Sequence, residues 1–227
     1  MAATWRRRLG RLRGAVRPKP EPHASPASHP AAPDPGPRPS EEEIGERRLA
    51  TFRRILGALP PGRLLDLGAG HGAFSQIGQE LGWDVTAVDA RTERMPMTEG
   101  IRWLQADVRT VDVTGYDCIA ILGLLYHLEL ADQLALLRRC AGTPTILDTH
   151  HALHPVVTID GWQGRIFVEA PVTPDELAHI PTASWGNPES FWATGPELVR
   201  MLHESGYGTV LALEPPILPD RTFYLCL

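Results

Sequence analysis

One stretch in the first half of the chain decides the fold, and it reads Leu64-Leu65-Asp66-Leu67-Gly68-Ala69-Gly70-His71-Gly72. Its apolar start predicts a buried strand, and its glycines predict a sharp turn at which the backbone can approach a ligand closely. Phe74, Ile77 and Leu81 then recur at helical spacing, so a helix is predicted to follow the turn with its free N-terminal amides directed at that ligand. Strand, glycine-rich turn and helix in this order are typical of α/β domains that bind nucleotides.

Short apolar segments alternate with helical segments along much of the chain. Ser40 and Glu43 form a capping box at the start of a first helix, and another helix is predicted over residues 128–140. Further strands are predicted over residues 85–88, 101–105, 118–122 and 145–147. This alternation predicts a parallel sheet that is covered by helices on both faces.

The C-terminal segment departs from the alternation. Residues 194–197 form a second capping box, which predicts a helix that ends at Gly206. Two strands follow over residues 210–213 and 222–225, and the proline-rich turn between them is too short for a crossover helix, so they are predicted to pair antiparallel. The expected fold class is a Rossmann-like, doubly wound α/β domain with a seven-stranded, mostly parallel sheet and an antiparallel C-terminal hairpin strand.

Acidic residues are predicted at the ends of three successive strands. Asp66 is expected at the mouth of the glycine turn, where its carboxylate would repel a pyrophosphate and attract an ammonium or sulfonium group. Asp89 can accept hydrogen bonds from both ribose hydroxyls, and Asp107 can meet an adenine amino group. The glycine pattern alone also fits a dinucleotide site, but the three acids together favour S-adenosylmethionine over NAD.

Several of these motifs together resemble the class I S-adenosylmethionine-dependent methyltransferases. They are residues 65–72, Asp89, the Ala106-Asp107-Val108 step and the final hairpin, and the resemblance covers residues 40–227. It implies S-adenosylmethionine as cofactor, bound by Asp66, Gly68, Ala69, Gly70, Asp89, Ala90, Asp107, Val108 and Leu122. More loosely, residues 122–128 and 184–192 are similar to segments of wobble-uridine tRNA-modifying enzymes and of natural-product methyltransferases.

Residues 149–193 are predicted to be an aromatic-rich insertion that covers the crevice at the carboxyl ends of the strands. Long loops in compact domains are commonly lids or binding elements. The alternative is a small accessory cluster whose aromatic side chains pack on one another. The aromatic side chains concerned are Trp162, Phe167, Trp185, Phe191 and Trp192.

Histidines are the candidate catalytic bases, because methyl transfer to a hydroxyl or an acidic N–H requires removal of a proton. His127 follows the predicted fourth strand, and His150 and His151 follow the fifth. A structural role for each is the alternative. Asp148, His150, His151 and His154 also carry metal-ligand chemistry, but the loop around Pro155 gives no reason for them to converge, so no metal site is predicted.

Residues 1–39 are predicted to be a tail outside the folded domain of residues 40–227. Up to Pro39 the chain has eight Lys or Arg residues against two acidic ones, a net charge of +6, so the remainder carries −11 of the total of −5. The basic start is followed by nine prolines from Pro18 to Pro39, which predicts disorder. Such an arm could bind RNA or an anionic membrane surface, whereas the acidic body is a poor partner for phosphates.

Composition indicates an ordinary globular protein, with 43% hydrophobic and 22% charged residues and no apolar run long enough to cross a bilayer. Cys118, Cys140 and Cys226 are far apart and lie in or beside apolar runs, which predicts buried thiols and a cytoplasmic location.

The sequence therefore predicts an S-adenosylmethionine-dependent methyltransferase that acts on oxygen or nitrogen of a small, natural-product-like acceptor. One alternative is an RNA- or tRNA-modifying methyltransferase that holds phosphates with its basic arm. Another is a non-catalytic module that binds the cofactor. The carboxylated form of S-adenosylmethionine fits the same pattern.

Overall fold

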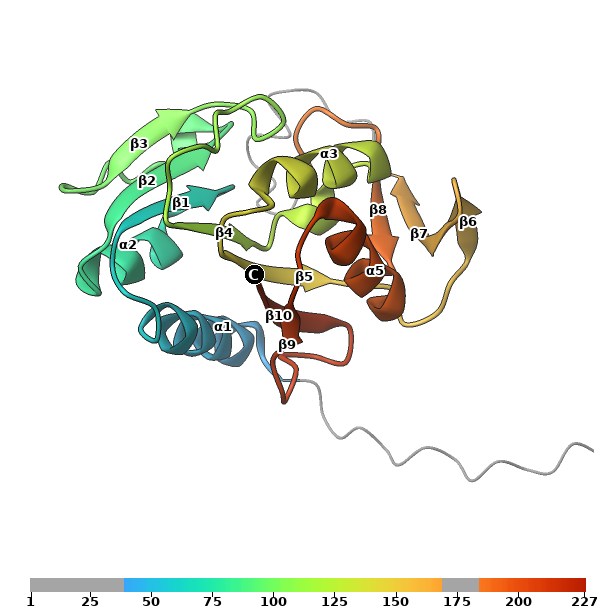
Figure 1. Cartoon of the computed structure of the whole chain (residues 1–227). Coiled ribbons are helices and arrows are strands. Elements are labelled where there is room, and N and C mark those ends of the chain that lie inside the picture. The colour runs from blue at the N-terminus through green and yellow to red at the C-terminus, as the bar shows by residue number, and fades with distance from the viewer. Residues whose placement is uncertain (1–38, 169–183) are drawn as a thin grey trace, which may run out of the picture. The chain divides into compact units, whose positions relative to one another are not determined.

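The computed structural model describes residues 39–168 and 184–227 (Figure 1). The predicted tail therefore lies outside the described residues except for Pro39, and so does the part of the predicted insertion over residues 169–183. No helix in the described ranges is long and apolar enough to cross a membrane.

A seven-stranded sheet forms the centre of the domain, in the order β3-β2-β1-β4-β5-β10-β9 (Figure 1). Six strands are parallel, and β10 alone runs opposite to both of its neighbours, as predicted. The strands are β1 (Arg63–Leu67), β2 (Asp84–Asp89), β3 (Arg102–Gln105), β4 (Cys118–Leu122), β5 (Thr145–His150), β9 (Val210–Ala212) and β10 (Arg221–Cys226). The predicted fold class is confirmed.

β5 continues three residues beyond its predicted end at Leu147. The polar triplet from Asp148 to His150 pairs in register with Arg221 to Phe223 of β10. Asp148 is fully buried, and guanidinium groups of Arg48 and Arg221 bind its carboxylate. A buried charge that is paired in this way can occupy a central strand. The polar residues after Leu147 therefore do not mark the end of β5.

The helices are α1 (Glu41–Leu56), α2 (Ala73–Glu80), α3 (Leu130–Cys140) and α5 (Gly195–Ser205), with 3₁₀ turns η1 (Thr92–Arg94) and η2 (Leu125–His127). The capping box at Ser40 is confirmed, because Ser40 Oγ accepts from Glu43 N and the Glu43 carboxylate accepts from Ser40 N. The second predicted capping box does not form. Thr194 precedes α5, but its side chain makes no cap bond, and the Glu197 carboxylate pairs with Arg200 instead.

Both faces of the sheet are buried, as a parallel sheet requires. In β1, Leu65 and Leu67 pack in a core with residues of α3 and α5. Leu64 lies in the second core, with residues of α1 and α2. The three cysteines are buried and unpaired, and burial raises the pKa of each thiol to about 12.

The predicted insertion contains a second, antiparallel sheet of three strands, β6 (Val157–Ile159), β7 (Trp162–Val168) and β8 (Glu189–Ala193). The sheet is joined to the main domain through Gln133 of α3, whose amide donates to the carbonyls of Leu128 and Phe191. Phe191 N also donates to Leu128 O. These bonds fix β8 beside η2, at the end of the central sheet where β4 ends (Figure 1).

Candidate active site

A pocket lies beyond the carboxyl ends of β1, β2 and β4. We call it the cofactor pocket. Its lining residues are Gly68, Asp89, Ala90, Arg91, Arg94, Asp107, Val108, Arg109, Gly123, Leu124, His127, Leu128, Ser184 and Trp185. The crevice is in the position expected for ligands of open α/β sheets.

The glycine turn forms one wall of this pocket. Gly68 has a φ of 73°, and its backbone N donates to Val88 O at the end of β2. A side chain there would also meet Leu124, whose Cδ1 lies 3.0 Å from the position of a Cβ atom. Only glycine can combine this backbone conformation with such close packing. Because Gly68 has no side chain, the backbone of the turn faces the pocket directly.

Asp89 lies at the end of β2 and lines the same pocket. Its two carboxylate oxygens accept from Gly70 N and Arg91 N, each at 2.9 Å. A carboxylate has about four acceptor positions, so two remain for a ligand. The side chain is held in a fixed position while it retains the capacity to accept from a ribose diol.

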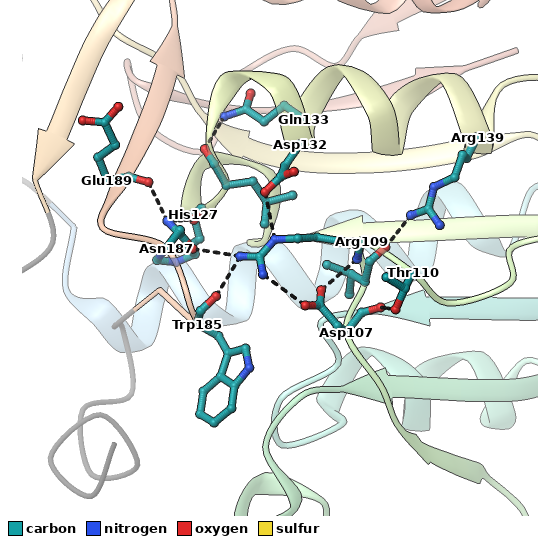
Figure 2. Close-up of polar contacts among 12 residues, drawn as sticks. Asp107, Arg109, Thr110, His127, Asp132, Gln133, Arg139, Trp185, Asn187 and Glu189 are labelled. Carbon is teal, nitrogen blue, oxygen red and sulfur yellow. Dashed lines mark hydrogen bonds and ion pairs between the residues drawn. The ribbon is translucent and has the colours of Figure 1, made fainter. Parts of the chain in front are cut away.

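Asp107 and Arg109 form the opposite wall, where Arg109 binds four other residues (Figure 2). Arg109 Nη1 donates to Asp107 Oδ2 at 3.0 Å, and Nη2 donates to Trp185 O at 2.9 Å and to Asn187 Oδ1 at 3.2 Å. Its Nε makes an ion pair with Asp132 of α3 at 2.8 Å. A single guanidinium thereby fixes the segment before β8 against the cofactor pocket.

Five predicted cofactor residues line the pocket, namely Gly68, Asp89, Ala90, Asp107 and Val108. Ala69, Gly70 and Leu122 do not, although Gly70 N holds Asp89. Leu122 is 5% exposed and packs in the core, while the next two residues, Gly123 and Leu124, line the pocket in its place.

The expectation for Asp66 at the mouth of the turn is wrong. Its side chain alternates with those of Leu65 and Leu67, so it faces α2 instead, where it is 1% exposed and accepts from Ser75 Oγ at 2.6 Å. Burial raises the pKa of Asp66 to about 6, and the nearby Asp89 adds to this effect.

The electrostatic reasoning that separated a sulfonium from a phosphate is also wrong. Two acidic residues, Asp89 and Asp107, line the cofactor pocket, but Arg91, Arg94 and Arg109 line it as well. These arginines follow the acidic residues closely in sequence, and the predicted strand ends did not include them. Net charge therefore does not identify the ligand.

A second pocket adjoins the first, and His127 lines both. We call it the aromatic pocket. Its lining residues are Tyr126, His127, His150, Phe167, Val168, Ser190 and Trp192. They come from η2, β5, β7 and β8, so the predicted insertion supplies a large part of the wall. His127 Nδ1 lies 3.1 Å from Ser184 Oγ.

The three candidate bases differ in their surroundings. His150 lines the aromatic pocket, but Arg221 donates to its Nε2 at 2.9 Å and Asp220 lies 3.2 Å from its Nδ1. Burial, reinforced by Arg221, lowers the pKa of His150. His151 lines neither pocket and faces a third cavity with Leu153 and Arg165, where burial lowers its pKa. Only His127 of the three lies where the two pockets meet.

The alternative metal site finds no support in this geometry. Asp148 is engaged by two arginines, and His150 binds Asp220 and Arg221. Within residues 39–168 and 184–227, no three His, Cys, Asp or Glu side chains are arranged to hold a metal ion.

Residues 41–147 match a family model described as a methyltransferase domain. The N-terminal domain of EvdMO1 with SAH bound has the same fold, with 20% identity over 82% of this chain and 80% of that chain and a TM-score of 0.63. Burkholderia thailandensis 1,6-didemethyltoxoflavin-N1-methyltransferase, with bound 1,6-didemethyltoxoflavin and S-adenosylhomocysteine, has 20% identity over 82% and 78% of the two chains and a TM-score of 0.57. The glycopeptide N-methyltransferase MtfA complexed with S-adenosylmethionine has 18% identity over 79% and 93%, with a TM-score of 0.54. Comparison with curated proteins gives no match.

These findings support the superfamily that the motifs resemble. Residues 41–147 match a methyltransferase domain, and the chain shares its fold with solved methyltransferases. Among the solved structures with this fold are ones that hold S-adenosylmethionine or S-adenosylhomocysteine.

Proposed function

We propose that this protein is an S-adenosylmethionine-dependent methyltransferase that acts on an oxygen or nitrogen atom of a small, natural-product-like molecule, with His127 as its base. The observation that carries the proposal is the position of His127, which lines both the cofactor pocket and the aromatic pocket. A base at this junction can reach an acceptor atom that faces the cofactor. The toxoflavin and glycopeptide methyltransferases with the same fold support a small acceptor.

The cofactor would be held by the residues of the cofactor pocket. Asp89 would accept from the ribose hydroxyls with its two remaining acceptor positions. Asp107 and Val108 would meet the adenine, and the turn at Gly68 would lie against the rest of the cofactor. Asp66, from its buried position, would support the turn through Ser75 of α2.

The chain's chemical role is to align the acceptor and to take its proton. Bound S-adenosylmethionine would supply a methyl group on a sulfonium sulfur, and that sulfur would leave as a neutral thioether with the electrons of the broken bond. The acceptor forms the new bond with a lone pair, and His127 receives its proton. In the tautomer in which His127 Nδ1–H donates to Ser184 Oγ, Nε2 is the basic nitrogen that would take the proton.

We also propose that residues 1–39 are a tail outside the folded domain and that the protein is cytoplasmic. Buried, unpaired thiols at Cys118, Cys140 and Cys226 support a reducing compartment. An RNA acceptor depends on the basic arm, which lies outside the described residues. A small acceptor, in contrast, is supported by the described pockets.

The test uses the full chain with S-adenosylmethionine and a mixture of small hydroxylated and N–H compounds, with product detection by mass spectrometry. We expect a methylated product, and we expect His127→Gln to lower turnover by about 10²- to 10⁴-fold, as is typical for loss of a general base. Calorimetry should show that His127→Gln weakens cofactor binding far less than turnover. His154→Gln is the control, because this histidine lines only the third cavity.

Each alternative gives a different result in the same experiment. Tight cofactor binding without any methylated product would favour the non-catalytic module. Methylation of tRNA that disappears at high salt, and after deletion of residues 1–39, would favour the RNA-modifying enzyme.

A further inference from the structure

The aromatic pocket differs from its neighbours in charge. None of its described lining residues is Lys, Arg, Asp or Glu. The cofactor pocket, in contrast, has three arginines and two aspartates. The third cavity shares Trp192 with the aromatic pocket and is also lined by Arg165 and Asp220. A charged ligand group would find no partner of opposite charge among these lining residues.

The walls of the aromatic pocket are flat rings that already contact one another. The Trp192 ring stacks on His150 with centroids 4.9 Å apart and an interplanar angle of 22°. Phe167 lies 4.3 Å from Trp192, and Tyr126 lies 5.3 Å from it in an edge-to-face arrangement. Rings fixed by such contacts lose little entropy when a planar ligand packs against them.

Most polar atoms of this wall are engaged within the protein. Both ring nitrogens of His150 have partners, Arg221 at Nε2 and Asp220 at Nδ1. The guanidinium of Arg221 also lies over the Tyr126 ring, 5.7 Å from its centroid. A ligand with many hydroxyl groups would leave several of them without hydrogen bonds, and each such loss costs about 1–3 kcal/mol.

We propose that the acceptor is an uncharged, planar aromatic or heteroaromatic compound, with its ring against Trp192 and Phe167 and its reacting hydroxyl or N–H directed at His127. This inference deepens the proposed function and rests on it. The acceptor ring would contact Phe167 of β7 and Trp192 of β8, while His127 of η2 would act as the base. The pocket would therefore select both the shape of the ring and the position of the reacting atom on it.

The test is calorimetric titration of the full chain, saturated with S-adenosylhomocysteine, with three probes of defined chemistry. Naphthol presents a flat neutral ring with one hydroxyl, hydroxynaphthoate adds a carboxylate to that ring, and methyl glucoside replaces the ring by a polyhydroxylated one. We expect naphthol to bind at least about tenfold more tightly than hydroxynaphthoate, and methyl glucoside to bind more weakly still.

Variants separate the aromatic pocket from the cofactor pocket. Trp192→Ala should weaken naphthol binding about tenfold and leave the affinity for S-adenosylhomocysteine unchanged, whereas Trp192→Phe should retain most of the binding. Leu153→Ala is the matched control, because this 58% exposed residue lies in the same insertion but lines only the third cavity.

Two outcomes would overturn the inference about the acceptor. One is that naphthol fails to bind, or binds no better than the other two probes, to a protein that binds S-adenosylhomocysteine. The other is that Trp192→Ala leaves naphthol binding unchanged. Failure of the wild-type chain to bind S-adenosylhomocysteine would instead contradict the proposed function, so the two failures are distinguishable.

Discussion

The cofactor pocket and the aromatic pocket meet at His127, but the chain builds them in different ways. Backbone turns and residues at strand ends form most of the cofactor pocket. The backbone amides of Arg91, two residues later, and of Gly70, in the glycine turn, position Asp89. Side chains from four separate elements form the aromatic pocket, and they are fixed by ring contacts and by bonds from β10. The first pocket is therefore specified locally, and the second by tertiary packing.

The largest expected effect is on the support of the aromatic pocket. Asp148→Ala would leave Arg221, which is 8% exposed, and Arg48, which is 21% exposed, without their carboxylate. Removing one partner of a buried ion pair typically costs about 3–5 kcal/mol, so we expect a loss of this size in chemical denaturation. Glu80→Ala is the control, because the exposed Arg53–Glu80 pair should contribute less than about 1 kcal/mol. Equal losses in both variants would contradict the comparison.

The buried carboxylate beneath the glycine turn should make stability depend on pH. The pKa of Asp66 is about 6 in the folded protein and 3.8 when the group is exposed, so its proton is held more tightly in the folded state. Its contribution to stability is complete below pH of about 4 and is lost as the pH rises through about 6. Relative to Asp66→Asn, the wild type should therefore lose on the order of 3 kcal/mol between pH about 4 and 7. Denaturation curves at both pH values measure this difference, and a constant difference would refute it.

The local character of the cofactor pocket can be tested at Asp89. Asp89→Ala removes a carboxylate expected to make two charged hydrogen bonds to the ribose, and it releases Gly70 N. We expect the dissociation constant for S-adenosylmethionine to rise about 100-fold in calorimetry. Asp112→Ala is the control, because this exposed carboxylate only accepts from Thr114 N in its own loop. Unchanged affinity in Asp89→Ala would show that the pocket holds another ligand or another pose.

The smallest expected effect concerns Arg109, which connects the insertion to the cofactor pocket. Arg109→Ala would release Trp185 and Asn187 from the wall near Asp107 (Figure 2). Because the guanidinium is partly exposed, we expect only about a tenfold rise in the dissociation constant for S-adenosylmethionine. Arg200→Ala also frees a bond to the insertion, at Gly161 O, but far from the pocket, and it should leave this affinity unchanged. Identical affinities in the two variants would count against a role for Arg109.

Local patterns predicted the fold and much of the cofactor pocket because they depend on near neighbours. The glycine turn, the strand ending at Asp89 and the reversed β10 follow from spacing and turn length. Alternation of side chains along β1 predicts that Asp66 lies on the same face as Leu64, toward α2, and this is where the structure places it. Its position near the end of the strand predicts exposure at the glycine turn instead, and that prediction is wrong.

The remainder depends on contacts between distant segments. Arg109 and Asn187 are 78 positions apart, and no periodicity links them. Ser184 and Trp185 lie in the segment of residues 184–192 that is similar to segments of other methyltransferases, but only packing places them on the cofactor pocket. For the same reason, His127, His150 and His151 were equivalent in sequence, whereas the structure gives them three different sets of neighbours.

The position of the insertion has a consequence for engineering this protein. β6, β7 and β8 enter between β5 and α5 and form their own sheet, so they supply two aromatic walls without contributing a strand to the central sheet. If the proposed acceptor site is right, exchange of residues 162–168 and 189–193 for those of a protein with the same fold would change the acceptor preference and leave β1 to β4 unaltered.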